Sequence, residues 1–356
     1  MQRHDQAVPE KPRAASALEI FSTCPQSRDC SPGDYVKRVV EVAQWSERAG
    51  CTGILVYTDN SIVDPWLVGQ ITLQSTERLS PLIAVQPIYM HPYTVAKMIA
   101  SYAFMHHRRV YLNMVAGGFR GDLQALNDPT HHDDRYERVR EYAQIITRLL
   151  DSPDPVTFEG RFYTVRNLRM TPPLPRELMP GLLMSGSSGA GMATARAIGA
   201  TSIIYPRPPE EEAKADAACL RRGARVGVIA RADPGEAWRI AHERFPDDRR
   251  GRAMHRMAMA ASDSIWHKQL SERPEGAGGE SSPYWLWPFE TYKGFCPYLV
   301  GSFDEVAAYL ARYVANGYRT YILDIPHSYE DLECAAAAFD GAVERSASEN
   351  ALATTG

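Results

Sequence analysis

The turn Gly186-Ser187-Ser188-Gly189 has the composition of a phosphate-binding site. It follows the apolar stretch 181–185 and directly precedes a helical pattern over 190–198. Backbone N–H groups are free at a helix N-terminus and the helix dipole is positive there, so these groups and the two serine hydroxyls can hold an anion together. A serine that only caps a helix gives the same pattern. The turn alone therefore leaves both interpretations open.

Polar side chains also lie at the ends of three earlier apolar stretches. Thr58 and Asp59 come directly after the stretch GILVY, and Gln86 and Asn113 lie near the ends of the next two. In a barrel of parallel strands, the carboxyl ends of the strands meet at the face that carries the active site. We therefore expect these four side chains to face the same site as the serine turn.

The segment His131-His132-Asp133-Asp134-Arg135-Tyr136 contains side chains that can bind metals. Adjacent residues rarely bind one ion together, and no second group of ligands follows at helical spacing. We predict no metal site and expect Asp133 or Asp134 to cap the next helix.

Eight short apolar stretches, separated by amphipathic helical patterns, would position these residues. The predicted strands are 18–23, 53–57, 82–88, 110–115, 181–185, 202–205, 225–230 and 319–323. Apolar strands without polar alternation indicate parallel βα units, and eight such units predict a (β/α)8 TIM barrel. A Rossmann-type sheet would need a glycine-rich turn after an early strand, and none follows the first two.

The same pattern sets the domain limits. We predict one barrel domain over 18–345, a disordered lead-in over 1–17 and a flexible tail over 346–356. Two insertions interrupt the repeat, namely 151–180 with a hairpin pattern and 246–299, which is polar first and aromatic later. The second lies between strands seven and eight and is a candidate lid, although core packing is the simpler interpretation of its aromatic residues.

The composition narrows the function further. The chain has 356 residues, a formal net charge of −4 and 44% hydrophobic residues, which is typical of a globular cytoplasmic protein and gives no reason to expect a nucleic acid or a membrane as partner. It lacks an apolar run long enough for a membrane span. The six cysteines show no disulfide-like spacing, which favours reduced thiols.

Taken together, the motifs resemble the bacterial luciferase-like monooxygenase family, especially its alkanesulfonate and nitrilotriacetate monooxygenase branch. The order and spacing of the motifs hold from about residue 20 to residue 339. The stretches that carry the resemblance are GILVYTDNSIVDPWLV (53–68), HPYTVA (91–96), YLNMVAGG (111–118), HDDRY (132–136), LMSGSS (183–188), EAW (236–238), LVGS (299–302) and IPH (325–327).

The resemblance implies a (β/α)8 barrel that uses reduced FMN, delivered by a separate NAD(P)H:flavin reductase. Ser187, Ser188 and Tyr136 would hold the FMN phosphate, and His132 and Asn113 would line the cofactor. Thr58, Asp59 and Gln86 would face the isoalloxazine or the ribityl chain. O2 would form a C4a-peroxyflavin that oxygenates a small molecule, and the protein would exclude water from it. We expect a homodimer or homotetramer.

The sequence departs from the alkanesulfonate enzymes at three polar positions. Ile62 stands where they carry a cysteine, Gly227 where they carry a histidine and Ile325 where they carry a tyrosine, while their strand-seven arginine is matched by Arg225. The resemblance makes Arg225 the candidate catalytic residue. Ile62 and Ile325 predict a more apolar substrate site. We therefore expect a biosynthetic intermediate in specialised metabolism, either free or bound to a carrier, rather than an alkanesulfonate.

Two other functions remain open at this point. A deazaflavin (F420)-dependent oxidoreductase shares the barrel and transfers hydride without O2. A non-catalytic flavin-binding protein would also keep the fold. The combination of HDDRY and NMVAGG favours FMN over F420.

Overall fold

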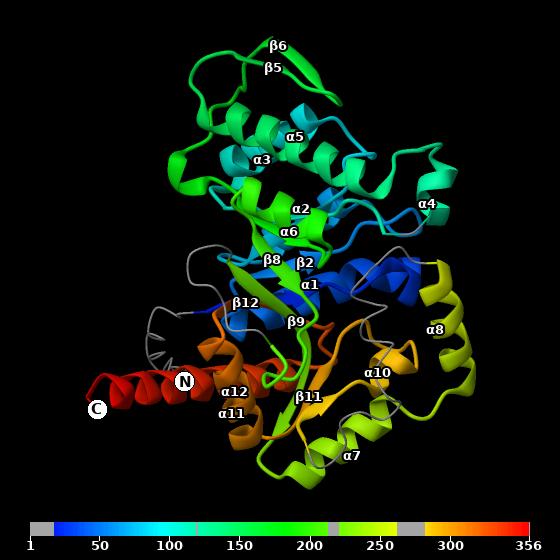
Figure 1. Cartoon of the computed structure of the whole chain (residues 1–356), viewed down its shortest axis with the longest axis vertical. Helices are drawn as coiled ribbons and strands as arrows, with labels where there is room; N and C mark the ends of the chain where they lie inside the picture. Colours follow the sequence, from blue (N-terminus) through cyan, green and yellow to red (C-terminus); the bar gives the residue numbers. More distant parts are fainter. Residues whose placement is uncertain (1–17, 119, 213–220, 262–281, 356) are drawn as a thin grey trace, which may run out of the picture.

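The computed structural model describes residues 18–118, 120–212, 221–261 and 282–355 (Figure 1). The predicted lead-in over 1–17 lies outside the described residues. The predicted tail over 346–356 instead continues the last helix, which ends at Thr355.

Eight parallel strands of the described chain close into a barrel in the order β1-β2-β3-β4-β7-β8-β9-β12, with β12 pairing β1, as predicted. The barrel strands are β1 (Glu19–Thr23), β2 (Gly53–Val56), β3 (Ser80–Val85), β4 (Tyr111–Met114), β7 (Gly181–Ser185), β8 (Thr201–Ile204), β9 (Arg222–Arg231) and β12 (Tyr318–Leu323). Most of these strand residues are buried, which explains why their sequences are apolar without alternation.

Helices surround the barrel and cover its outer face (Figure 1). The described helices are α1 (Pro32–Arg48), α2 (Pro65–Ser75), α3 (Pro92–His106), α4 (Arg120–Ala125), α5 (His132–Asp151), α6 (Gly189–Ala197), α7 (Pro234–Arg244), α8 (Arg249–Ala261), α10 (Trp287–Glu290), α11 (Phe303–Ala315) and α12 (Tyr329–Thr355), with short 3-10 turns η1 (Ser27–Asp29) and η2 (Arg176–Leu178). An acceptor side chain followed by proline begins α1, α2 and α7, where Ser31, Asp64 and Asp233 cap the helices.

Strand β9 is longer than predicted and has two partners along one edge. Its first half pairs with β12 up to Val226, and its second half pairs with β11 (Tyr298–Ser302) from Gly227 onward. Only the first half belongs to the barrel wall. Arg225 therefore lies at the carboxyl end of the barrel part of the strand, although the sequence pattern placed it at the strand's start.

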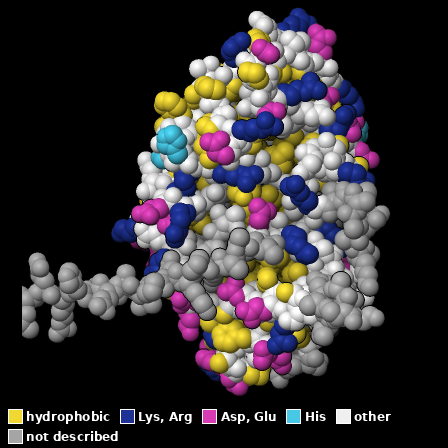
Figure 2. Space-filling view, turned by 90° about the vertical axis from the view of Figure 1, so that its left-hand side faces the viewer, with side chains coloured by type: hydrophobic (Ala, Val, Ile, Leu, Met, Phe, Trp, Pro, Cys, Tyr) yellow, Lys and Arg dark blue, Asp and Glu magenta, His cyan; other side chains and the backbone are white. Residues whose placement is uncertain are grey.

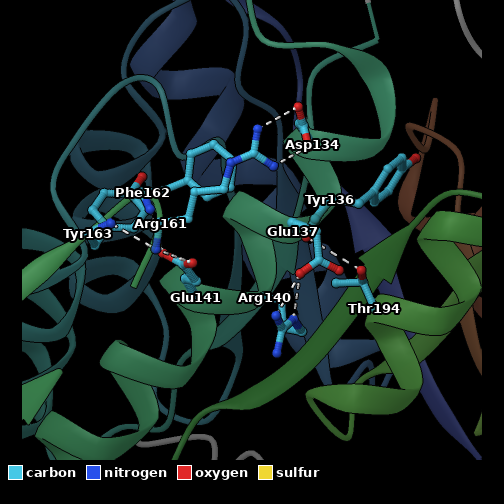
Figure 3. A network of polar contacts seen from close by, with 9 residues as sticks. All are labelled: Asp134, Tyr136, Glu137, Arg140, Glu141, Arg161, Phe162, Tyr163 and Thr194. Carbon is cyan, nitrogen blue, oxygen red and sulfur yellow. Dashed lines mark hydrogen bonds and ion pairs between the residues drawn. The ribbon is translucent and has the colours of Figure 1, made fainter. Parts of the chain in front are cut away.

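The first insertion forms the predicted hairpin, β5 (Val156–Glu159) and β6 (Thr164–Leu168), which packs against α5. Figure 3 shows how it is held: the buried carboxylate of Glu141 accepts hydrogen bonds from the backbone N–H groups of Arg161, Phe162 and Tyr163 at 2.8–3.2 Å. Asp134 forms an ion pair with Arg161 at 2.5 Å and does not cap α5, so the capping prediction was wrong.

The second insertion contains α8, α10 and the two-residue strand β10 (Tyr284–Trp285), which pairs with β11. The sequence prediction missed α11, which follows directly. Its start is a capping box, in which Ser302 accepts from the N–H of Glu305 and the Glu305 carboxylate accepts from the N–H of Ser302. Helices α11 and α12 lie side by side (Figure 1).

A buried ion-pair cluster joins β9, α7 and α12. The Asp331 carboxylate lies 2.7 Å from Nη2 of Arg231 and 2.8 Å from Nη2 of Arg244. Burial alone would raise the pKa of Asp331, but the hydrogen bonds from Arg244 and Arg231 outweigh it and hold the pKa below its ordinary value of 3.8. A lowered folded pKa contributes stability that is present above pH ~4 and is lost as pH falls through the folded pKa.

We therefore expect Asp331→Asn to lower the free energy of unfolding by about 3–5 kcal/mol at neutral pH, because it leaves buried arginines without their counter-charge. Urea unfolding at a series of pH values between 6 and about 3 measures both effects. The wild type should lose stability below pH ~4 more steeply than the variant. Asp304→Asn is the control, since Asp304 is largely exposed; equal pH profiles for wild type and Asp331→Asn would contradict the assignment.

Candidate active site

A cavity of about 270 Å³ opens at the carboxyl ends of the barrel strands. Its floor is apolar and formed by the barrel interior, including Leu55, Ala84, Ile203 and Ile322. All eight predicted cofactor residues line it, namely Thr58, Asp59, Gln86, Asn113, His132, Tyr136, Ser187 and Ser188, and so does Arg225. Separate segments of the sequence thus meet in one site.

The serine turn forms one end of this cavity. Ser188 is the N-cap of α6 and its Oγ accepts from the N–H of Gly191 at 3.0 Å. The Oγ of Ser187 is buried and has no hydrogen-bond partner among the described residues. A buried hydroxyl without a partner is costly, so a ligand atom at this position would satisfy it.

Tyr136 of α5 lies against the same turn. Gly186 has a φ of 149°, and a Cβ on it would lie 2.8 Å from the Tyr136 hydroxyl. Glycine is needed here because of both the backbone conformation and this close approach. The backbone carbonyl of Tyr136 accepts a 3.4 Å hydrogen bond from Thr194 of α6, which joins the two helices (Figure 3). The Tyr136 hydroxyl is thus held beside the turn.

The side of the cavity next to Tyr136 carries an imidazole and two amides. The His132 ring lies edge-on to the Tyr136 ring at 5.1 Å between centroids. The amide oxygen of Asn113 accepts from Ser185 Oγ at 2.9 Å, which fixes the amide on the cavity wall. Gln86 is buried on the neighbouring strand end.

Two carboxylates and one guanidinium line the opposite rim. Nη2 of Arg28 pairs with Asp59 at 2.6 Å, and Asp59 also accepts from the backbone N–H of Ser61 at 2.6 Å. Burial and the nearby charge of Asp59 raise the pKa of Asp122, while Arg28 opposes this shift. Asp59 therefore serves to order the loop after β2, and sequence reasoning did not find Arg28 or Asp122.

Arg225 is buried in the cavity wall among aromatic and acidic groups. Its guanidinium carbon lies 4.9 Å from the centre of the Tyr57 ring, and Nη2 lies 3.6 Å from Oδ1 of Asp324. Within the described chain, Nε and Nη2 of Arg225 and the Tyr57 hydroxyl have no hydrogen-bond partner. Two walls of one cavity thus hold buried polar groups that a bound molecule would satisfy.

The aromatic run of the second insertion divides into two sets. Tyr284, Trp285 and Phe289 are buried in the core, which agrees with the interpretation of these aromatic residues as core packing. Tyr292 and Phe295 line the cavity and contact each other at 5.7 Å between ring centroids. Only this second set can cover a bound ligand.

Residues 18–320 of this barrel match the luciferase-like monooxygenase family. The chain belongs to this family. It is similar to the 4-(gamma-L-glutamylamino)butanoyl-[BtrI acyl-carrier protein] monooxygenase BtrO of Niallia circulans, with 34% identity over 304 residues, which are 84% of this chain and 89% of the relative. The chain is therefore an enzyme, an oxidoreductase of the luciferase-like monooxygenases.

Solved structures share the fold of this luciferase-like monooxygenase. The EDTA monooxygenase of Chelativorans sp. BNC1 matches with a TM-score of 0.66 and 15% identity over 94% of each chain. The oxygenating constituent of 3,6-diketocamphane monooxygenase from the CAM plasmid of Pseudomonas putida, solved in complex with FMN, matches with a TM-score of 0.63 and 16% identity over 91% of this chain and 96% of that one.

The luciferase-like barrel shows why Gly227 cannot carry the histidine of the alkanesulfonate enzymes. A Cβ at Gly227 would lie only 2.3 Å from the nearest ring carbon of Tyr298 on the neighbouring strand β11, which is a severe steric clash. The Tyr298 hydroxyl donates to Asp324 at 2.8 Å, and Asp324 faces Arg225. Tyr298 and Asp324 therefore occupy the space beside Arg225.

Neither predicted substrate residue lines the cavity. Ile62 is half-buried in the loop after β2, and Ile325 lies at a small separate hollow with His327 and Asp331. Their role at the substrate therefore stays a prediction. The apolar lining of the cavity consists of the barrel floor with Tyr292 and Phe295.

Proposed function

We propose that this enzyme is the oxygenating component of a two-component system, which takes reduced FMN from a separate NAD(P)H:flavin reductase and uses O2 to oxygenate an acyl intermediate carried on a carrier protein. The observation that supports this cofactor is the buried Ser187 hydroxyl at the N-terminus of α6, which has no hydrogen-bond partner among the described residues and lies near the hydroxyl of Tyr136. That arrangement fits a phosphate monoester.

The fit extends along the cavity. Ser187, Ser188 and Tyr136 would bind the phosphate, and His132, Asn113 and Gln86 offer hydrogen bonds to the rest of FMN. Reduced FMN, when bound, supplies electrons to O2 and so one oxygen atom for the substrate. The protein's own part is to orient the substrate and exclude water, and the apolar floor with Tyr292 and Phe295 suits this task.

Arg225 is the proposed group for the reacting end of the substrate. It is a fixed buried cation whose charge Asp324 balances at 3.6 Å, and its Nε and Nη2 form no hydrogen bond with any described residue. Such donors bind a carbonyl or carboxylate oxygen. The acyl substrate is supported by the relative that acts on a carrier-bound acyl group, at 34% identity over most of both chains.

An anaerobic titration tests the cofactor. We expect reduced FMN to bind more tightly than oxidised FMN, and F420 not to bind, in fluorescence and absorbance titrations of the purified protein. Mixing the reduced complex with O2 in a stopped-flow instrument should give a transient near-ultraviolet flavin absorbance before oxidised FMN appears. Tight binding of F420 with no binding of FMN in either redox state would assign hydride transfer instead, and flavin binding without any reaction with O2 would indicate a non-catalytic protein.

A further inference from the structure

Helix α8 presents an outer face without acidic residues. Its sequence, RRGRAMHRMAMAA, contains four arginines and no Asp or Glu, in a chain whose formal net charge is −4. Arg249, Arg250 and Arg256 are exposed and form no ion pair with any residue that the structure describes. On the face of the molecule that Figure 2 shows, by contrast, Lys and Arg side chains are interspersed with Asp and Glu.

The same face of α8 exposes two large apolar side chains. Met254 is 48% exposed and Met257 is 73% exposed, and they follow Arg250 by four and seven residues, which places them on the same side of the helix as Arg250. Methionine and arginine are enriched in protein interfaces, and methionine adapts its shape to a partner.

The inner face of α8 connects it to the cavity. His255 is buried against Phe289 at 4.6 Å between ring centroids and faces Tyr292 at 6.3 Å. Tyr292 lines the cavity. The carboxylate of Asp248, at the start of the helix, forms an ion pair with Lys293 at 2.8 Å and not with an arginine of α8. Figure 1 places α8 on the same side of the molecule as α4, whose Asp122 also lines the cavity.

We propose that the outer face of α8, formed by Arg249, Arg250, Met254, Arg256 and Met257, is the docking surface for the carrier protein that delivers the substrate. This inference rests on the proposed function, since it assumes a carrier-bound acyl group. The partner is a protein with exposed carboxylates and a small apolar patch, because these complement the arginines and methionines. Docking there sets the carrier at the edge of the cavity, and the acyl group on its flexible arm enters past Tyr292.

The test compares one acyl group in two forms. The probes are the 4-(gamma-L-glutamylamino)butanoyl thioester on the carrier protein BtrI and the same acyl group on free pantetheine, with FMN, NADH and a supplied reductase. The test variant is Arg249→Glu/Arg250→Glu/Arg256→Glu. The control variant is Lys37→Glu/Arg169→Glu/Arg176→Glu, which changes the net charge equally at exposed positions outside α8.

We expect the α8 variant to lower kcat/KM for the carrier-bound substrate about tenfold or more, through KM, and to change that for the pantetheine thioester less than about twofold. The control should leave both unchanged, and the wild-type KM for the carrier should rise with NaCl. Equal activity of the α8 and control variants on the carrier-bound substrate would overturn the docking surface.

A binding measurement separates this inference from the proposed function. Biolayer interferometry of immobilised BtrI in its pantetheine-bearing form against each variant reports docking without turnover. If the acyl group is not oxygenated but BtrI binds the wild type and not the α8 variant, the surface stands and the substrate assignment is wrong. If BtrI binds the wild type and the α8 variant alike, or binds neither, the surface is wrong, whatever the enzyme oxidises.

Discussion

The double substitution Ser187→Ala/Tyr136→Phe should weaken FMN binding by a factor on the order of a hundred or more, while riboflavin binding changes only a few-fold. Riboflavin lacks the phosphate, and each charge-assisted hydrogen bond to a phosphate contributes about 1.5–3 kcal/mol. The Ser187 hydroxyl has no other partner in the described chain, so its removal leaves nothing unsatisfied in the free protein. Fluorescence titration with both ligands measures the difference.

Two further variants help to interpret the affinities of the double variant. Ser348→Ala/Tyr329→Phe removes the same two kinds of hydroxyl outside the cavity and should leave both affinities unchanged. Ser188→Ala is a less clean probe, because Ser188 caps α6 and its loss costs about 1 kcal/mol of helix stability. Equal losses of affinity for FMN and riboflavin in the first variant would place the phosphate elsewhere.

Tyr292→Ala/Phe295→Ala should divert oxygen from product to H2O2, with a several-fold rise in peroxide formed per NADH, while FMN affinity stays within a few-fold of the wild type. These two rings are the aromatic side chains of the second insertion that line the cavity. Without them water reaches the site, and reduced flavin then yields peroxide instead of oxygenating the substrate. The ratio of H2O2 to oxygenated product, with a supplied reductase, is the measurement.

Point substitutions are needed for this experiment. Trimming 283–295 would also remove Tyr284, Trp285 and Phe289, which are buried in the core, and would destabilise the fold by several kcal/mol. Phe104→Ala is the control, since its ring is 70% exposed outside the cavity. An unchanged ratio of H2O2 to product in the double variant would show that Tyr292 and Phe295 only contribute to packing.

The barrel was predictable because its signals are local. A strand buried on both faces must be apolar throughout, and GILVY shows this without any knowledge of its neighbours. The helix starts at Ser31, Asp64 and Asp233 were readable for the same reason, since each cap lies within three residues of the N–H it accepts from. The capping box of α11 was equally local, and Ser302 with Glu305 was the signal that would have found that helix.

The site was only partly predictable. Residues at strand ends meet wherever the barrel closes, so Asn113, His132 and Ser187 could be grouped from the sequence. Positions in long loops depend on contacts with distant segments, and this is why the sequence could not show that Ile62 and Ile325 lie outside the lining of this cavity. The role of Asp324 beside Arg225 depends on a ladder between β9 and β12 that joins residues almost a hundred positions apart.

Strand β9 pairs with β12 in its first half and with β11 in its second half, and it thereby links the cavity wall to the segment beside the cavity. One continuous strand carries Arg225 in its barrel half and holds β11, and with it the segment that bears Tyr292 and Phe295, in its other half. Suppose that a molecule binds Arg225 more tightly when that segment covers the cavity. Its binding then shifts the equilibrium of the segment toward the covering position by the same factor as the gain in affinity. With Arg225 as the proposed substrate group and the two rings as the proposed cover, substrate recognition and water exclusion would share one coupling free energy.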